Sequence, residues 1–231
     1  MTSPAAVALL GAPRTASALA QRLGLPVSAT TEDTHLDVAA ELDADLVIGM
    51  AEVPWPTAEH LHAQGSAELG SYTGVVSWYA LPRLHEHLAE VAAPAVAAGA
   101  HLLVTAPDLG PEAAPTDVMF LREVAEALTQ RLQPRSRSIA WRGTSRTPTA
   151  SEALVSLTQA HDRADVVEVP VAPGSSADPT LEREAERLGV RLTCADLGAG
   201  VLVELLAEVV GTVAGHEGID DPDGVADGNG G

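Results

Sequence analysis

Short apolar runs alternate with helical patterns along this chain. Runs rich in Val, Leu, Ile and Ala predict strands, and apolar residues at helical spacing predict the helices between them. Strands that alternate with helices are typical of βαβ units and a parallel sheet. In the first half, we expect strands at residues 6–10, 26–30, 46–50 and 75–80, and helices at 14–23, 35–42, 58–64 and 84–98.

The same order of elements starts again after residue 100. Asp178 and Pro179 are typical of a helix N-terminus, and Gly189 is typical of the end of that helix. Thr116 and Ser151 are expected to cap two other helices. In this half, we expect strands at residues 102–105, 138–141, 165–169 and 190–195, and helices at 117–132, 152–159, 178–189 and 201–213.

The repeated order indicates an internal duplication. Short sequence matches support it, since residues 12–13, 44–47 and 88–91 resemble residues 106–107, 164–167 and 206–209. We therefore expect an α/β fold of two similar four-stranded parallel-sheet subdomains with a ligand cleft between them. The expected halves are residues 1–99 and 100–214. Residues 215–231 are Gly-rich and acidic, and we expect a disordered tail because they bury too little apolar surface to order themselves.

The chain is strongly acidic, which limits its partners. Its 231 residues carry a formal charge of −19, and all 13 basic residues are arginine. Nucleic-acid binding and docking on anionic lipid both need a basic surface, so we expect neither. The single cysteine, Cys194, excludes an internal disulfide and a four-cysteine zinc site. Its apolar surroundings favour a small core residue.

Hydropathy predicts no membrane segment. The apolar helix expected at 201–213 contains Glu204 and Glu208 and is too short to cross a bilayer. The N-terminus has no basic start, so we expect it to form the first strand and not a signal peptide. These features favour a cytoplasmic protein, and its oligomeric state stays open.

Histidines gather after the third and fourth expected strands. His60 and His62 follow one strand with Glu59 beside them, and His85 and His87 follow the next. Ligands bind beyond the carboxyl ends of parallel strands, and imidazoles with a carboxylate suit a divalent metal such as cobalt, iron or nickel. Residues two apart on a helix do not share a face, so at most one of each pair is expected to reach a common ion. The alternative interpretation is a set of solvated surface histidines.

A second polar cluster follows the strand expected at 138–141. Arg142 and Arg146 flank a glycine and two hydroxyl residues just ahead of a helix. Forked guanidinium donors near a helix N-terminus suit a carboxylate or a phosphate, and an ordinary polar loop is the alternative. The chain has no glycine-rich nucleotide motif and no nucleophile elbow, so no nucleotide cofactor is expected.

One stretch of the second half resembles a known family. Residues 164–174 form a hydrophobic strand ending in Val-Pro and a glycine turn, followed by a helix at 181–189, a strand ending near 197–198, and a Leu-rich helix at 202–209. Together with residues 102–107 and 120–128, this segment resembles a half-domain of the class II tetrapyrrole chelatases, which include the sirohydrochlorin and cobalt chelatases. Two such halves in one chain match the long form of that family.

The resemblance implies a chelatase-like lyase that inserts a divalent metal into a sirohydrochlorin-type tetrapyrrole. Cobalt, iron or nickel would be a substrate, and the tetrapyrrole would be the small-molecule partner. Histidine and glutamate would bind the metal and accept the pyrrole protons, arginines would bind substrate carboxylates, and an aromatic side chain would line the site. The residues expected to do this are Glu59, His60, His62 and His85 for the metal and the protons, and Trp55, Arg142 and Arg146 for the substrate.

The chain departs from the family at the metal-binding positions. The family carries a histidine in the turn after the first strand, but residues 11–13 and 106–108 contain none. A second family histidine follows the third strand; residues 174–176 lack it, whereas His60 is available in the first half. Two alternatives therefore stay open. One is a diverged, non-catalytic tetrapyrrole- or metal-binding regulatory protein of the same fold, and the other is an unrelated small-molecule α/β enzyme.

Overall fold

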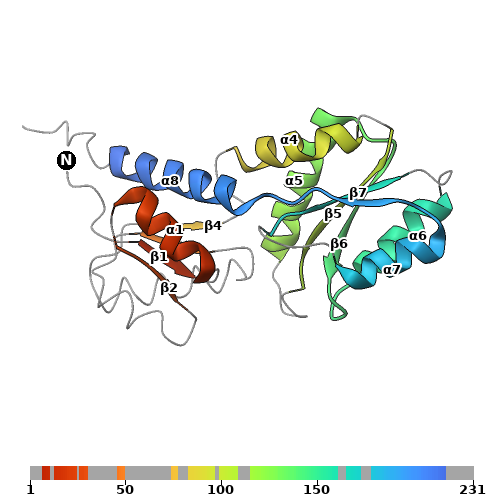
Figure 1. Cartoon of the computed structure of the whole chain (residues 1–231), viewed down its shortest axis with the longest axis horizontal. Helices are drawn as coiled ribbons and strands as arrows, with labels where there is room; N and C mark the ends of the chain where they lie inside the picture. Colours follow the sequence, from red (N-terminus) through yellow and green to blue (C-terminus); the bar gives the residue numbers. More distant parts are fainter. Residues whose placement is uncertain are drawn as a thin grey trace, which may run out of the picture.

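Two parallel sheets with their helices make up the described part of the chain (Figure 1). The computed structural model describes residues 7–10, 13–24, 26–30, 46–49, 74–77, 83–96, 99–108, 115–160, 165–172 and 178–216. The expected α/β fold of two four-stranded parallel-sheet subdomains is thereby confirmed. The boundaries of the halves and the cleft between them stay predictions.

The first sheet comes from the N-terminal half of the chain. Its strands run parallel in the order β2-β1-β3-β4, and helix α1 (Pro13–Leu23) connects the first two in sequence. The helices expected at 35–42 and 58–64 lie outside the described residues. The four strands are β1 (Val7–Leu10), β2 (Val27–Thr30), β3 (Leu46–Gly49) and β4 (Gly74–Ser77).

The second sheet repeats this arrangement. Its strands run parallel in the order β6-β5-β7-β8. When the strands of each sheet are numbered from one to four along the chain, both sheets have the order 2-1-3-4. The strands are β5 (His101–Pro107), β6 (Arg137–Arg142), β7 (Val166–Pro170) and β8 (Leu192–Cys194). The remaining helices are α4 (Leu84–Val96), α5 (Pro115–Leu132), α6 (Ala150–Ala160), α7 (Pro179–Leu188) and α8 (Ala199–His216).

The register of the two sheets supports the duplication. In β1, Val7 pairs with Leu46, the first residue of β3. In β5, His101 likewise pairs with Val166, the first residue of β7. Counting forward from these pairs, residues 12–13 become the counterparts of residues 106–107, which is the match that the sequences suggest.

Helices α4 and α8 are exchanged between the two sheets. Helix α4 follows β4 in sequence but packs against α5 and β7, whereas α8 follows β8 but lies along α1 (Figure 1). Arg22 of α1 and Glu204 of α8 form an ion pair with two contacts of 3.0 Å. None of the helices in the described ranges has the length and apolar composition needed to span a bilayer.

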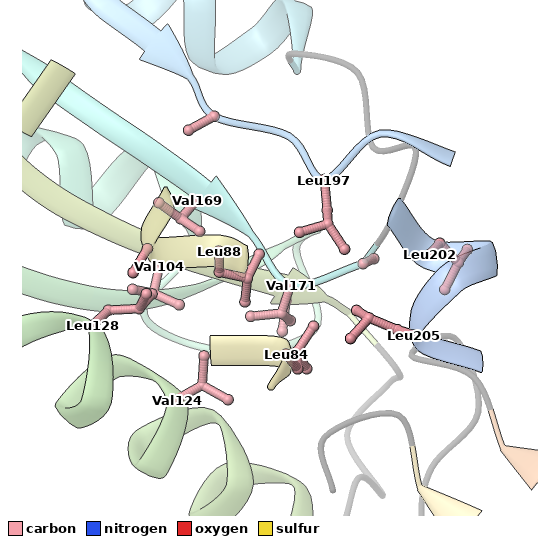
Figure 2. Packing of buried hydrophobic residues seen from close by; sticks show 14 of the residues in the cluster. Leu84, Leu88, Val104, Val124, Leu128, Val169, Val171, Leu197, Leu202 and Leu205 are labelled. Carbon is pink, nitrogen blue, oxygen red and sulfur yellow. The ribbon is translucent and has the colours of Figure 1, made fainter. Parts of the chain in front are cut away.

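The exchanged helices bury their apolar faces in one hydrophobic cluster. Leu84 and Leu88 of α4, and Leu202 and Leu205 of α8, are almost fully buried. Figure 2 shows Leu84 and Leu205 in the same cluster as Val171, which follows β7. Full burial of such a leucine contributes about 1.5–3 kcal/mol. The cluster therefore joins elements from both halves of the sequence.

The caps of α7 match the expectation from sequence. Asp178 adopts an extended conformation, and its carboxylate accepts a hydrogen bond from the Thr180 backbone N–H at 2.8 Å. Gly189 ends the helix in the left-handed region at φ 68°, where a residue with a Cβ is disfavoured. Local signals therefore determine both ends of this helix.

The expected starts of α5 and α6 are both two residues too late. Helix α6 begins behind Thr149 and not Ser151: the Thr149 hydroxyl accepts from the Glu152 N–H at 3.2 Å, and Glu152 Oε2 accepts from the Thr149 N–H at 2.9 Å. This reciprocal pair is a capping box. Helix α5 begins at Pro115, so Thr116 lies within its first turn. Proline at the first helical position is favoured because its missing N–H has no partner to lose there.

Candidate anion-binding site at the second sheet

The loop after β6 is anchored to Asp108 at the carboxyl end of the second sheet. Asp108, just beyond β5, accepts a hydrogen bond from the Ser145 backbone N–H at 2.6 Å. Gly143 has a φ of 151°, and a Cβ built there would lie 2.3 Å from the Cβ of Asp108. Only glycine allows the backbone to come this close to Asp108. The contact therefore fixes the position of the loop that carries Arg142 and Arg146.

A row of polar side chains crosses the face of the second sheet that α6 and α7 cover. The apolar residues of that face are Leu103, Ala140 and Val166, which pack in one cluster with residues of both helices. Because side chains alternate between faces along a strand, the residues two positions further on share this face. The resulting row, called the polar row below, consists of Arg142 of β6, Thr105 of β5, Glu168 of β7 and Cys194 of β8.

Glu168 is the centre of the polar row. Its Oε1 accepts a hydrogen bond from the Thr105 hydroxyl at 2.8 Å and another from Arg142 Nε at 2.9 Å. The Arg142 Nη2 atom lies 3.9 Å from the Cys194 sulfur. Glu168 and Thr105 are fully buried, whereas the Arg142 side chain keeps 15% of its surface exposed. Part of the arginine therefore reaches the surface while its carboxylate partner does not.

The surroundings of the polar row determine two protonation states. Burial lowers the pKa of Arg142, but the hydrogen bond and the negative charge of Glu168 outweigh burial, and the pKa is raised overall. Burial raises the pKa of the Cys194 thiol to about 11, and the charge of Glu168 adds to this. At neutral pH the guanidinium is charged and the thiol is protonated, so Cys194 is a poor nucleophile.

Arg146 lies against the other face of the sheet. Its guanidinium is 4.1 Å from the centre of the Trp141 ring, a cation–π geometry. Trp141 belongs to the cluster on the α4 and α5 side, whereas its strand neighbour Arg142 faces α6 and α7. The two arginines that the sequence places in one loop thus have different partners, and carboxylate binding by either one stays a prediction.

A small hollow lies beside this loop, at the N-termini of α6 and α7. Its volume is about 290 Å³, and Thr144, Ser151 and Thr180 contribute hydroxyls to it. Asp178 also lines the hollow and already caps α7. A second negative group would be repelled by this carboxylate, so the hollow does not favour an anion.

The histidine site is only partly within the described residues. His85 lies half-buried in the first turn of α4, and His87 on the same helix contacts Glu90 at 3.2 Å. The described residues contain no group of three or more side chains placed to hold a metal ion. The other expected residues, Trp55, Glu59, His60 and His62, lie outside the described residues. The metal site therefore stays a prediction.

Sequence analysis missed Glu168 and Thr105. A signal was present, since Glu168 interrupts an otherwise apolar strand at residues 166–170. Strands buried on both faces of a parallel sheet normally read as continuous hydrophobic runs, and glutamate is almost never fully buried unless it has a partner. The identity of the partner was not readable, because Arg142 is 26 residues away and Thr105 is 63 residues away.

Comparison with known proteins shows a likeness of fold without a likeness of sequence. No protein family and no curated protein matches the chain. Its structure resembles that of CbiX, the terminal enzyme of siroheme biosynthesis in denitrifying bacteria, with a TM-score of 0.58 and 16% identity over 90% of this chain and 97% of that one. At this identity the likeness shows the fold, and it agrees with the two-sheet architecture above.

Two further solved structures are more distant. One is an ABC transporter solute-binding protein from Burkholderia graminis in complex with D-arabinose, with a TM-score of 0.45 and 12% identity over 91% of this chain and 88% of that one. The other is a periplasmic metal-binding protein from Candidatus Liberibacter asiaticus, with a TM-score of 0.44 and 11% identity over 90% and 99%. Both are too distant to bear on function, and the chelatase-like fold is the likeness that the comparisons support.

Proposed function

We propose that this protein binds a sirohydrochlorin-type tetrapyrrole and inserts a divalent metal, cobalt or iron, into it. The observation that carries the proposal is the likeness to the siroheme-biosynthesis enzyme over nearly the full length of both chains. The strand and turn pattern of residues 164–198, which resembles the same class of chelatases, is independent support from the sequence. A fold does not by itself specify a function, so the test must measure the chemistry.

Each proposed residue has a role that its chemistry suits. Metal insertion replaces two pyrrole N–H protons by one divalent ion, so the site needs metal ligands and proton acceptors. His60 and His85 supply neutral imidazoles to the metal, and His62 is the alternative ligand to His60, because only one residue of that pair faces the ion. His60 and Glu59 accept the pyrrole protons. These four residues come from the first half of the sequence.

The substrate side of the proposal rests on the second half. Sirohydrochlorin carries several carboxylates, and guanidinium groups bind carboxylates through paired hydrogen bonds. Arg142 and Arg146 supply these groups at the carboxyl end of the second sheet, and Trp55 supplies an apolar face for the macrocycle. Local arginines have to overcome the field of a chain with a net charge of −19, and the loss of binding on replacing Arg142 and Arg146 by glutamine should shrink as salt is added, because added ions screen exposed pairs.

A spectral titration tests this proposal. The full chain is titrated with sirohydrochlorin, and the absorbance change is followed with and without Co²⁺ against the rate of insertion in buffer. The proposal expects binding without metal and faster insertion with it. Replacing His60 and His85 by alanine should abolish the acceleration, whereas His87→Ala, on the same helix as His85 but paired with Glu90, should keep it. Insertion at the buffer rate would reject the catalytic proposal.

One observation favours a second candidate, a non-catalytic tetrapyrrole-binding protein of the same fold. The turn after β5, where the family carries a metal-binding histidine, holds Asp108, and this carboxylate anchors the neighbouring loop through Ser145. The position thus has a structural use in this chain. Tight sirohydrochlorin binding by the parent protein with no faster insertion of Co²⁺ would favour this second candidate.

A further inference from the structure

The polar row is not a requirement of the fold. Register identifies its counterparts in the first sheet: Leu9 pairs with Ile48 as Leu103 pairs with Glu168. Ile48 then pairs with Val76 as Glu168 pairs with Cys194. The same four-stranded sheet is therefore built in the first half with aliphatic residues where the second half has a buried carboxylate and a thiol.

Thr105 follows the same rule. It lies two residues beyond Leu103, and the residue two beyond Leu9 is Gly11, which has no side chain to donate a hydrogen bond. At the position that corresponds to Thr105, the first half of the sequence therefore has no hydroxyl that could hold a carboxylate. Glu168, which accepts a hydrogen bond from Arg142, and Thr105, which donates one to Glu168, are therefore not repeated at the corresponding positions of the first half of the sequence.

Stability is a weak reason to bury this ion pair. Moving two charges out of water costs several kcal/mol for each, and the attraction between them repays this only if every polar atom finds a partner. Glu168 Oε2 is buried and accepts no hydrogen bond from the residues that the structure describes. An uncharged pair of similar volume would pack here without that cost, and the first sheet has Ile48 at the position of Glu168. The pair therefore calls for a functional explanation.

We infer that Glu168 and Thr105 are positioning residues that hold the Arg142 guanidinium at the carboxyl end of the sheet to receive a carboxylate of the bound tetrapyrrole. This inference rests on the proposed function, and it names the residues through which the substrate's acidic side chains are recognised. The Thr105 hydroxyl fixes Glu168 Oε1, and the same oxygen fixes Arg142 Nε. The exposed part of the arginine then meets the ligand in one orientation.

The gain from such positioning is conformational. A free arginine side chain loses about 2 kcal/mol of rotamer entropy when it is immobilised by a ligand, and a guanidinium that is already fixed avoids much of this loss on binding. Glu168 also opposes an anionic ligand through its charge. Loss of the carboxylate would therefore tighten anion binding if charge alone mattered, and would weaken it if positioning dominates. The two explanations predict opposite signs.

Uroporphyrin is the probe that tests this inference, because it carries eight carboxylates and its binding needs no metal. Its dissociation constant is measured at low salt for the full-length parent, Glu168→Gln, Arg142→Gln and the double variant. We expect Glu168→Gln to raise the dissociation constant about tenfold, which corresponds to about 1.4 kcal/mol. Because Glu168 acts through Arg142, its replacement should have no further effect in the Arg142→Gln chain.

Further variants guard against simple loss of folding. Thr105→Val removes the hydroxyl while keeping the shape and should weaken binding about threefold, whereas Thr105→Ser should retain parental binding. Glu184→Gln is the matched control, because it removes the same charge from an exposed ion pair on α7, where Glu184 contacts Arg187 at 2.6 Å. This control should bind as the parent does.

Each outcome decides between the inference and the proposed function. An unchanged or lower dissociation constant in Glu168→Gln, or an equal loss in the Arg142→Gln background, overturns the inference even if metal insertion is observed. Porphyrin binding with the expected coupling but without metal insertion overturns the catalytic proposal and leaves the inference standing. A parent chain that binds no porphyrin overturns both.

Discussion

The close approach of Gly143 to Asp108 predicts a large effect from adding a single methyl group. In Gly143→Ala, the new Cβ would meet the Asp108 Cβ at 2.3 Å and its carboxylate oxygen at 2.4 Å. The Cβ of Asp108 is attached to the backbone beyond β5, so rotation of its side chain cannot relieve the contact. The φ of 151° adds strain, because residues with a Cβ rarely adopt it.

The magnitude follows from two separable terms. The backbone conformation costs about 1–3 kcal/mol for a residue other than glycine. Displacing Asp108 also breaks its hydrogen bond to the Ser145 N–H, which is worth about 1–3 kcal/mol. The loop is exposed and relaxes in part, so we expect Gly143→Ala to lower the free energy of unfolding by about 2–4 kcal/mol.

Urea unfolding followed by circular dichroism measures this change. Gly198→Ala is the control, because a Cβ at Gly198 would have no atom within 4 Å; its effect should stay below about 1 kcal/mol, the cost of alanine in place of glycine ahead of helix α8. In a chain that also carries Asp108→Gly, the clash is absent and only the backbone share should remain. An effect of Gly143→Ala no larger than that of Gly198→Ala would show that the loop does not approach Asp108 this closely.

Three further predictions come from other parts of the structure. Burial raises the pKa of the Cys194 thiol to about 11, so iodoacetamide should label the native chain at pH 8 far more slowly than the urea-unfolded chain; equal rates would contradict this placement. Leu88→Ala should lower the free energy of unfolding by about 2–5 kcal/mol, because Leu88 is fully buried on exchanged helix α4; a loss below about 1 kcal/mol in urea unfolding would show that α4 does not pack there. Hydrogen bonds from Arg83 and Arg131 hold the pKa of the Glu86 carboxyl below its ordinary value of 4.5. The stabilising contribution of the Glu86 carboxylate is therefore present above pH 4.5 and is lost as the pH falls through the folded-state pKa. Between pH 5 and pH 3, the Tm of Glu86→Gln should fall less than that of the parent. Parallel curves of Tm against pH would contradict the pairing of Glu86 with the two arginines.

Local patterns along the chain are enough to predict the order of the elements and the class of fold. Apolar runs and helical spacing are local properties, and they placed all eight strands within three residues of their observed bounds. The ends of α7 were equally local, because Asp178 and Gly189 act on the backbone next to them. The cap of α6 was missed by two residues because Thr149 and Ser151 are both acceptable cap residues within one turn. Helix α5 begins two residues earlier than expected because Pro115 suits the first helical position.

The surface that each helix covers depends on contacts between elements far apart in the chain. The spacing of the leucines predicts an apolar face on each of the two exchanged helices, but an apolar face does not specify which surface it packs against. These leucines are Leu84 and Leu88 of α4, and Leu202 and Leu205 of α8. Nothing local indicates that α4 packs on the sheet that follows it or that α8 returns to α1. Burial is non-directional, so the choice depends on the whole set of surfaces to be covered.

The candidate site divides in the same way. The sequence predicts that residues 142–146 form a polar loop after a strand, but it does not predict which residues they contact. Because Arg142 and Arg146 are close in sequence, they were expected to act together. In the structure, side chains alternate between the faces of the sheet, so Arg142 contacts Glu168 on one face and Arg146 contacts Trp141 on the other. Glu168 was visible as an acid within an apolar strand. Its role depends on strands far apart in the chain, because parallel pairing brings Thr105, Arg142 and Glu168 into one row only after the sheet has formed.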